Sequence, residues 1–82
     1  MNGWKNLATW NVALFINNDE GLYRAAVRYA SATDKPTYLG FIFSLGLEDA
    51  HTDDGVSWTS LALDLDALDE MMLELVELPV GA

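Results

Sequence analysis

Hydrophobic residues fall into four segments along the chain, separated by polar residues, glycine and proline. The first segment, between Thr9 and Asn17, is apolar at almost every position and is therefore predicted to be buried. With Thr9 as N-cap, it forms a short helix that begins at Trp10. Alternate apolar positions from Trp10 to Ile16 also fit a strand, and so short a run does not decide between the two. Helix is favoured because no hairpin turn separates this segment from a helical one.

The next two segments have the spacing of amphipathic helices. The second follows a cluster of capping residues at 17–20, and Glu20 stands four residues before Arg24, the favourable order for an ion pair. The third follows Pro36, which suits the first turn of a helix, and Gly46 predicts its end. The two apolar stripes consist of Leu22, Ala25, Ala26 and Tyr29, and of Tyr38, Phe41, Ile42 and Leu45.

The last segment is predicted to be the longest helix. It follows a polar loop at 48–55, which contains an Asp-Gly turn signal, and an irregular stretch at 56–63. The helix begins with Asp64 or Asp66 as N-cap and runs to about Leu78, where proline and glycine follow. Its apolar seam consists of Leu65, Leu68, Met72 and Leu75.

These elements predict an all-α fold, a single domain over 1–82 built as a compact bundle of three or four short helices. The alternative is an α+β fold in which Trp10–Ile16 and Phe41–Phe43 are strands. Apolar residues make up 51% of the chain, which is enough for a core. A domain this small often gains stability by forming a homo-oligomer, and the absence of cysteine excludes disulfides, thiolate metal sites and a cysteine nucleophile.

Charge is distributed unevenly along the sequence. The chain has 4 basic and 13 acidic residues, and all the basic ones precede Pro36. This balance argues against binding to nucleic acid or to anionic membranes and favours a partner with a basic surface. No signal peptide and no apolar run of about 20 residues is present, so a cytoplasmic protein without a membrane span is expected.

The outer face of the last helix carries four acids that do not help the helix form. Like charges four residues apart repel, and acids near the C-terminal end oppose the helix dipole. They either keep the protein soluble or form a surface for a basic partner. Trp4 and Trp58 stand beside loops and either fill the core or line the same partner surface. The candidate partner-binding residues are thus Asp66, Glu70, Glu74, Glu77, Trp4 and Trp58.

Few residues point to catalysis. His51 is flanked by Asp49 and Asp53, and an enzyme would need it as an acid–base pair with Asp53 or Asp54. A solvated loop histidine is the favoured interpretation. The loop also fails the spacing of a calcium-binding EF-hand, so the sequence predicts no catalytic residue, cofactor or metal. Asn11 is unusual in an apolar run and, if buried, must be hydrogen-bonded to backbone near Gly3 or to a neighbouring loop.

Two blocks of the sequence resemble a known family. The first joins Asn-Gly-Trp-Lys-Asn at 2–6 to Thr-Trp-Asn-Val-Ala-Leu at 9–14. The second joins Asp-Gly-Val-Ser-Trp at 54–58 to Leu-Asp-Leu-Asp-Ala-Leu-Asp-Glu-Met at 63–71. With these blocks the chain resembles a family of small uncharacterised proteins found in tailed bacteriophages, prophages and plasmids. The resemblance implies a mobile-element context and no particular chemistry.

Charge and resemblance together favour a non-catalytic accessory protein that acts in the host cytoplasm. It would bind a host protein with a basic surface, such as a nucleic-acid-handling or defence factor, as an inhibitor or anti-defence protein. The alternative is a small helical homo-oligomer with a structural or assembly function, for which the apolar seam of the last helix and the many aromatic residues are the basis.

Overall fold

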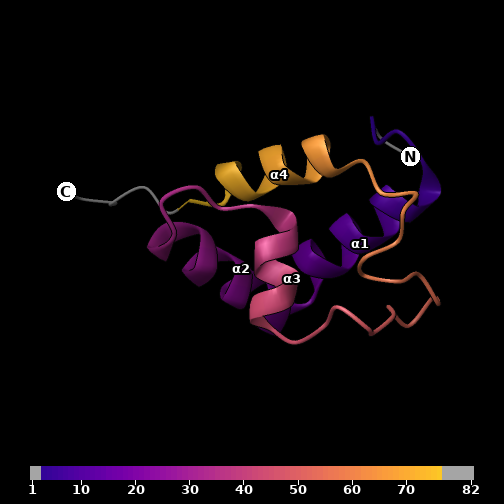
Figure 1. Ribbon diagram of the computed structural model, residues 1–82, viewed down its shortest axis with the longest axis horizontal. Helices are drawn as coiled ribbons and strands as arrows, with labels where there is room; N and C mark the ends of the chain where they lie inside the picture. Colours follow the sequence, from indigo (N-terminus) through magenta and orange to yellow (C-terminus); the bar gives the residue numbers. More distant parts are fainter. Residues whose placement is uncertain (1–2, 77–82) are drawn as a thin grey trace.

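The computed structural model describes residues 3–76 of the chain, which form four helices and no strand (Figure 1). The helices are α1 (Leu7–Asn18), α2 (Glu20–Ala32), α3 (Tyr38–Ser44) and α4 (Leu65–Glu74). Helix α1 packs mainly on α2, and α4 packs against both α2 and α3. The predicted all-α fold is confirmed, and the α+β alternative is wrong because its two proposed strands lie within α1 and α3.

Helix α1 begins one turn earlier than the sequence predicted. Asn6 is its N-cap, and the Asn6 Oδ1 accepts a hydrogen bond from the Thr9 backbone N–H at 2.8 Å. Asparagine is a better N-cap than threonine, so local preference already favours Asn6. Thr9 is fully buried, and its Oγ1 accepts a hydrogen bond from the backbone N–H of Asp64 at 2.9 Å. This contact with a distant part of the chain reinforces the start of α1 at Leu7.

The ends of α2 and α3 follow mostly local rules. Asp19 caps α2 by accepting a hydrogen bond from the Leu22 N–H. Thr37 caps α3, so the prediction that Pro36 lies in the first turn is wrong, and Pro36 lies just before the helix. Gly46 ends α3 with a φ of 71°, a conformation that glycine adopts without strain.

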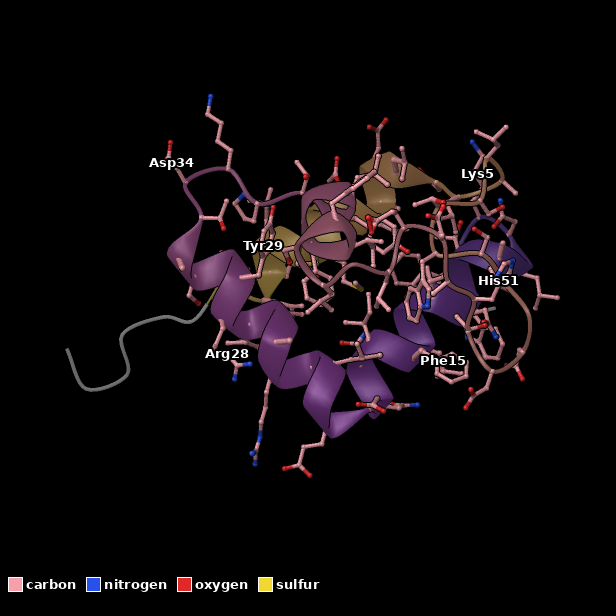
Figure 2. The ribbon with its side chains drawn as sticks, turned by 60° about the horizontal axis from the view of Figure 1, so that its bottom comes forward. Lys5, Phe15, Arg28, Tyr29, Asp34 and His51 are labelled. Atoms are coloured by element: carbon pink, nitrogen blue, oxygen red, sulfur yellow. The ribbon has the colours of Figure 1, made fainter. Side chains whose placement is uncertain are left out.

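The core lies between the four helices. Its largest fully buried side chains are Tyr38, Phe41, Ile16, Ile42, Leu68, Met72 and Val12. Figure 2 shows Tyr29 of α2 directed toward α3, where its ring lies 5.8 Å from the ring of Phe41. Gly40 permits this close approach, because a Cβ atom there would come within 2.1 Å of the Tyr29 hydroxyl oxygen.

Helix α4 is shorter than predicted. Of the two predicted caps, Asp64 and Asp66, Asp64 is the N-cap. The helix ends at Glu74 and has 10 residues against 13 in α2, so the prediction that it is the longest helix is wrong. The predicted end at Leu78 lies outside the described residues. In the apolar seam, Leu68 and Met72 are fully buried and belong to the core of the chain, whereas Leu65 is 37% exposed.

The segment between α3 and α4 is irregular but well anchored. Two antiparallel backbone hydrogen bonds, from Thr52 N to Val56 O and from Trp58 N to Ala50 O, close a short hairpin-like turn. The Trp58 side chain is buried, and the Trp58 carbonyl accepts a hydrogen bond from the Tyr38 hydroxyl at 2.7 Å. Burial raises the pKa of the Tyr38 phenol. None of the four described helices combines the length and hydrophobicity that crossing a membrane requires.

Candidate functional site

A groove between the N-terminal segment and α4 brings together three of the predicted partner-binding residues, Trp4, Glu70 and Glu74. Its volume is about 300 Å³. We refer to it as the acidic-aromatic groove. Its lining residues are Gly3, Trp4, Ala67, Glu70, Met71 and Glu74.

Helix geometry and one hydrogen bond place these side chains together. At 100° per residue, Glu70 and Glu74 lie on the same flank of α4 as Met71, whose side chain is buried. The N-terminal segment is held near α4 by Asn6, whose Nδ2 donates a hydrogen bond to the Ala62 carbonyl at 2.7 Å. The Trp4 side chain is half-buried and packs against the core, so it forms a fixed wall of the groove.

The two carboxylates of the groove are exposed, and no ion pair neutralises either one. Within residues 3–76 the single ion pair joins Arg24 to Glu20 on α2. Figure 2 shows Arg28, further along α2, extending into solvent on the side away from α4. The groove therefore presents an uncompensated negative charge next to an indole ring.

This combination of groups suits a cationic side chain. The face of an indole attracts ammonium and guanidinium groups, and carboxylates form strong hydrogen bonds with them. A guanidinium is especially suitable, since it stacks on aromatic rings while its N–H groups bond to carboxylate oxygens. The chemistry that the groove supports is the recognition of an arginine or lysine side chain.

Of the other three predicted residues, Asp66 and Trp58 do not line this groove. Asp66 is exposed in the first turn of α4, where its charge is favourable for the helix dipole. Trp58 is only 4% exposed and fills the core, so we leave it out of the candidate surface. Glu77 lies outside the described residues.

Asn11 links α1 to the segment between α3 and α4. Its side chain is 4% exposed, and its Nδ2 donates a hydrogen bond to Asp54 Oδ2 at 2.7 Å. Its Oδ1 accepts a hydrogen bond from the Thr52 hydroxyl at 2.8 Å. The hydrogen-bond partners expected for the buried Asn11 side chain thus come from the neighbouring loop. The two sequence blocks that carry the family resemblance meet at this contact.

His51 lies on the surface of the same loop, as Figure 2 shows. Asp54, one of the two acids considered as the acid–base partner of His51, is hydrogen-bonded to Asn11. The other, Asp53, is exposed. Among residues 3–76 no three His, Asp or Glu side chains are grouped so that they could hold a metal ion.

A second groove was not foreseen from the sequence. It lies between α3 and the segment that leads into α4, and its volume is about 480 Å³. We refer to it as the apolar groove. Its lining residues are Leu39, Phe43, Glu48, Asp49, Thr59, Ser60, Leu61, Leu63 and Leu65. The one local signal is Leu61, a large apolar residue within an irregular stretch.

Comparison with known proteins places the chain in a family. The model of a protein family, described as a family of unknown function (DUF7249), matches residues 1–78. This range includes both grooves and the contact between Asn11 and Asp54. No curated protein and no solved structure matches the chain. The chain therefore belongs to the family of unknown function DUF7249.

Proposed function

We propose that this chain is a non-catalytic accessory protein of a phage or other mobile element that binds a basic surface of a host protein in the host cytoplasm. The observation that supports the proposal most directly is the arrangement of Trp4, Glu70 and Glu74 around one groove. Trp4 is far from the two glutamates in the sequence, and repulsion between Glu70 and Glu74 does not favour the helix. The resemblance of the two sequence blocks to phage and plasmid proteins supports the mobile-element context.

In the proposed mode of binding, an arginine or lysine side chain of the partner enters the acidic-aromatic groove. Its charged group lies over the Trp4 indole and bonds to Glu70 or Glu74. A cation on an aromatic face contributes about 0.5–2 kcal/mol, and a hydrogen bond to a charged group about 1.5–3 kcal/mol. The net charge of −9 attracts a basic partner before contact and makes association sensitive to salt.

The charge also indicates the class of partner. Proteins that handle nucleic acid present clusters of arginine and lysine to phosphate groups. An acidic protein that occupies such a cluster competes with the nucleic acid for it. The host partner is accordingly a nucleic-acid-handling or defence factor, which this chain inhibits by covering its basic surface.

The test is capture of host proteins on immobilised chain at about 0.15 M salt, a concentration at which distant surface charges are screened. Three variants are compared with the wild type. E70Q/E74Q removes both carboxylates of the groove, and W4F keeps an aromatic ring while weakening its attraction for cations. The control D34N/D53N removes the same number of charges at exposed positions outside the acidic-aromatic groove.

We expect the wild type and D34N/D53N to retain the same basic host protein, whereas E70Q/E74Q loses it and W4F retains less. Added DNA should displace the captured protein, because both ligands use the same basic surface. Equal capture by all four proteins would show that the groove is not the binding surface, and loss by D34N/D53N as well would show only a general effect of charge.

A further inference from the structure

The apolar groove exposes large side chains that the fold does not need. Leu61 is fully exposed, Phe43 is 58% exposed and Leu65 is 37% exposed. Single exposed leucines are ordinary on protein surfaces. Here, however, three exposed apolar side chains line one groove, and continuous apolar surface of this kind marks an interaction site.

Hydrogen bonds of neighbouring residues also fix the backbone at Leu61. The turn that carries it is closed by hydrogen bonds from Leu63 N to Ser60 O at 3.2 Å and from Ala62 N to Ser60 Oγ at 3.1 Å. The side-chain amide of Asn6 donates a hydrogen bond at 2.7 Å to the carbonyl of Ala62, the residue after Leu61. Because the backbone at Leu61 is already ordered, binding has only the Leu61 side chain to immobilise there, and this favours affinity.

The charge around the groove indicates what binds there. Glu48 and Asp49 are part of its lining, and the range from 36 to 82, which supplies every lining residue, contains no lysine or arginine. A second copy of the chain would bring the same acids close to each other. Charge complementarity therefore favours an apolar segment flanked by basic residues over self-association.

We propose that the apolar groove binds an amphipathic helix of a partner protein, with apolar side chains over Leu61 and Phe43 and flanking lysines or arginines near Glu48 and Asp49. No strand borders the groove within residues 3–76, so an extended peptide has no edge to pair with there. Polyproline segments dock in grooves lined by aromatic rings, whereas four of the five apolar side chains that line this groove are leucines, so an apolar helix face is the recognition mode that fits.

This surface is separate from the acidic-aromatic groove. Leu65 and Glu70 are both on α4 but five residues apart, which places them about 140° apart around the helix axis. The two grooves therefore lie on different flanks of α4. Variants can test one surface without changing the other.

The probe is a fluorescein-labelled peptide of about 18 residues, a length of five helical turns, with a leucine stripe flanked by lysines. A second peptide carries the same stripe flanked by glutamates. Binding is measured by fluorescence anisotropy for the wild type, L61S, F43S and E48Q/D49N. The matched control is L7S, because Leu7 is 63% exposed on α1 and does not line the groove.

We expect the lysine peptide to bind the wild type and L7S equally. L61S should weaken binding by about tenfold or more, the factor that burial of one leucine side chain is worth. F43S should weaken it similarly, and E48Q/D49N should reduce the preference for the lysine peptide over the glutamate peptide. Because Leu61 is fully exposed in the free protein, L61S should leave the melting temperature unchanged, so a loss of binding cannot be due to unfolding.

Four results would overturn the proposal. One is equal binding of the lysine peptide to wild type and L61S, and another is equal binding of the two peptides to the wild type. The third is a wild-type dimer in sedimentation that L61S converts to monomer, because a second copy is then the occupant. If E70Q/E74Q abolishes peptide binding and L61S does not, the peptide occupies the acidic-aromatic groove, and the inference fails while the proposed function stands.

Discussion

Replacing Asn11 with aspartate should make the stability of the protein depend strongly on pH. In the wild type the Asn11 amide donates to Asp54 Oδ2 at 2.7 Å. N11D puts a second carboxyl group at this distance, and two carboxylates so close cannot both ionise without a large cost. Repulsion and burial therefore raise the pKa of the introduced carboxyl in the folded state above its unfolded value of about 3.9.

The sign of the effect follows from proton binding. Between pH 5 and pH 7 the folded variant holds a proton that the unfolded chain has lost, so stability falls as pH rises. The slope is at most about 1.4 kcal/mol per pH unit, or about 2.7 kcal/mol over this range. Because Asp54 is exposed and solvent screens part of the repulsion, we expect a loss of about 1–2 kcal/mol. In a chain this short, that corresponds to a fall in melting temperature of roughly 5–15 °C.

The assay is thermal unfolding followed by far-ultraviolet circular dichroism at pH 5, 6 and 7, with the wild-type curve subtracted. At pH 5 the protonated carboxyl donates to Asp54 as the amide does, and N11D should approach the wild type.

N11A should be destabilised by about 1–3 kcal/mol at every pH, because it removes both hydrogen bonds of the side chain. N11D/D54N exchanges the amide and the carboxylate and should lose the pH dependence. The reasoning is refuted if N11D parallels the wild type across the range, or if the exchange leaves its pH dependence intact.

Three further predictions concern packing, capping and charge. G40A should lower stability by about 1–2 kcal/mol because its Cβ meets the Tyr29 hydroxyl, and Y29F should restore much of this loss in a double-mutant cycle measured by urea unfolding. D64A should cost about 1 kcal/mol in the same assay, since Asp64 Oδ1 accepts the hydrogen bond that caps α4. The melting temperature should rise with sodium chloride, and E70Q/E74Q should raise it at low salt and flatten the salt dependence; a melting temperature that falls with salt would contradict this.

Sequence reasoning succeeded where structure depends on neighbours in the chain. The stripe and caps of α2, the end of α3 at Gly46 and the cap of α4 at Asp64 all follow local rules, and each is confirmed. It was wrong about the start of α1. Asn6 is a better cap than Thr9, and the Thr9 hydroxyl accepts a hydrogen bond from Asp64, a distant contact that no local pattern indicates.

The candidate site was predictable in part for the same reason. The acidic face of α4 follows from helical spacing, so Glu70 and Glu74 could be named from the sequence. That Trp4 joins them and Trp58 does not depends on contacts across the fold. Both tryptophans stand beside loops in the sequence, but one lines the groove on α4 and the other is buried beside the Tyr38 hydroxyl. The apolar groove was missed because its lining comes from three separate segments of the chain.

The hydrogen bonds that α1 makes to later segments also constrain the order of folding. Asn6, Thr9 and Asn11 bond to residues that follow them by 56, 55 and 43 positions. During synthesis α1 and α2 emerge first and can pair early, because their contacts are local. The polar groups of Thr9 and Asn11 stay without these partners until the segment before α4 has emerged. The first helical hairpin is therefore a nucleus that only the second sequence block can complete, and a chain that stops before Asp54 should form helix without reaching a stable native state.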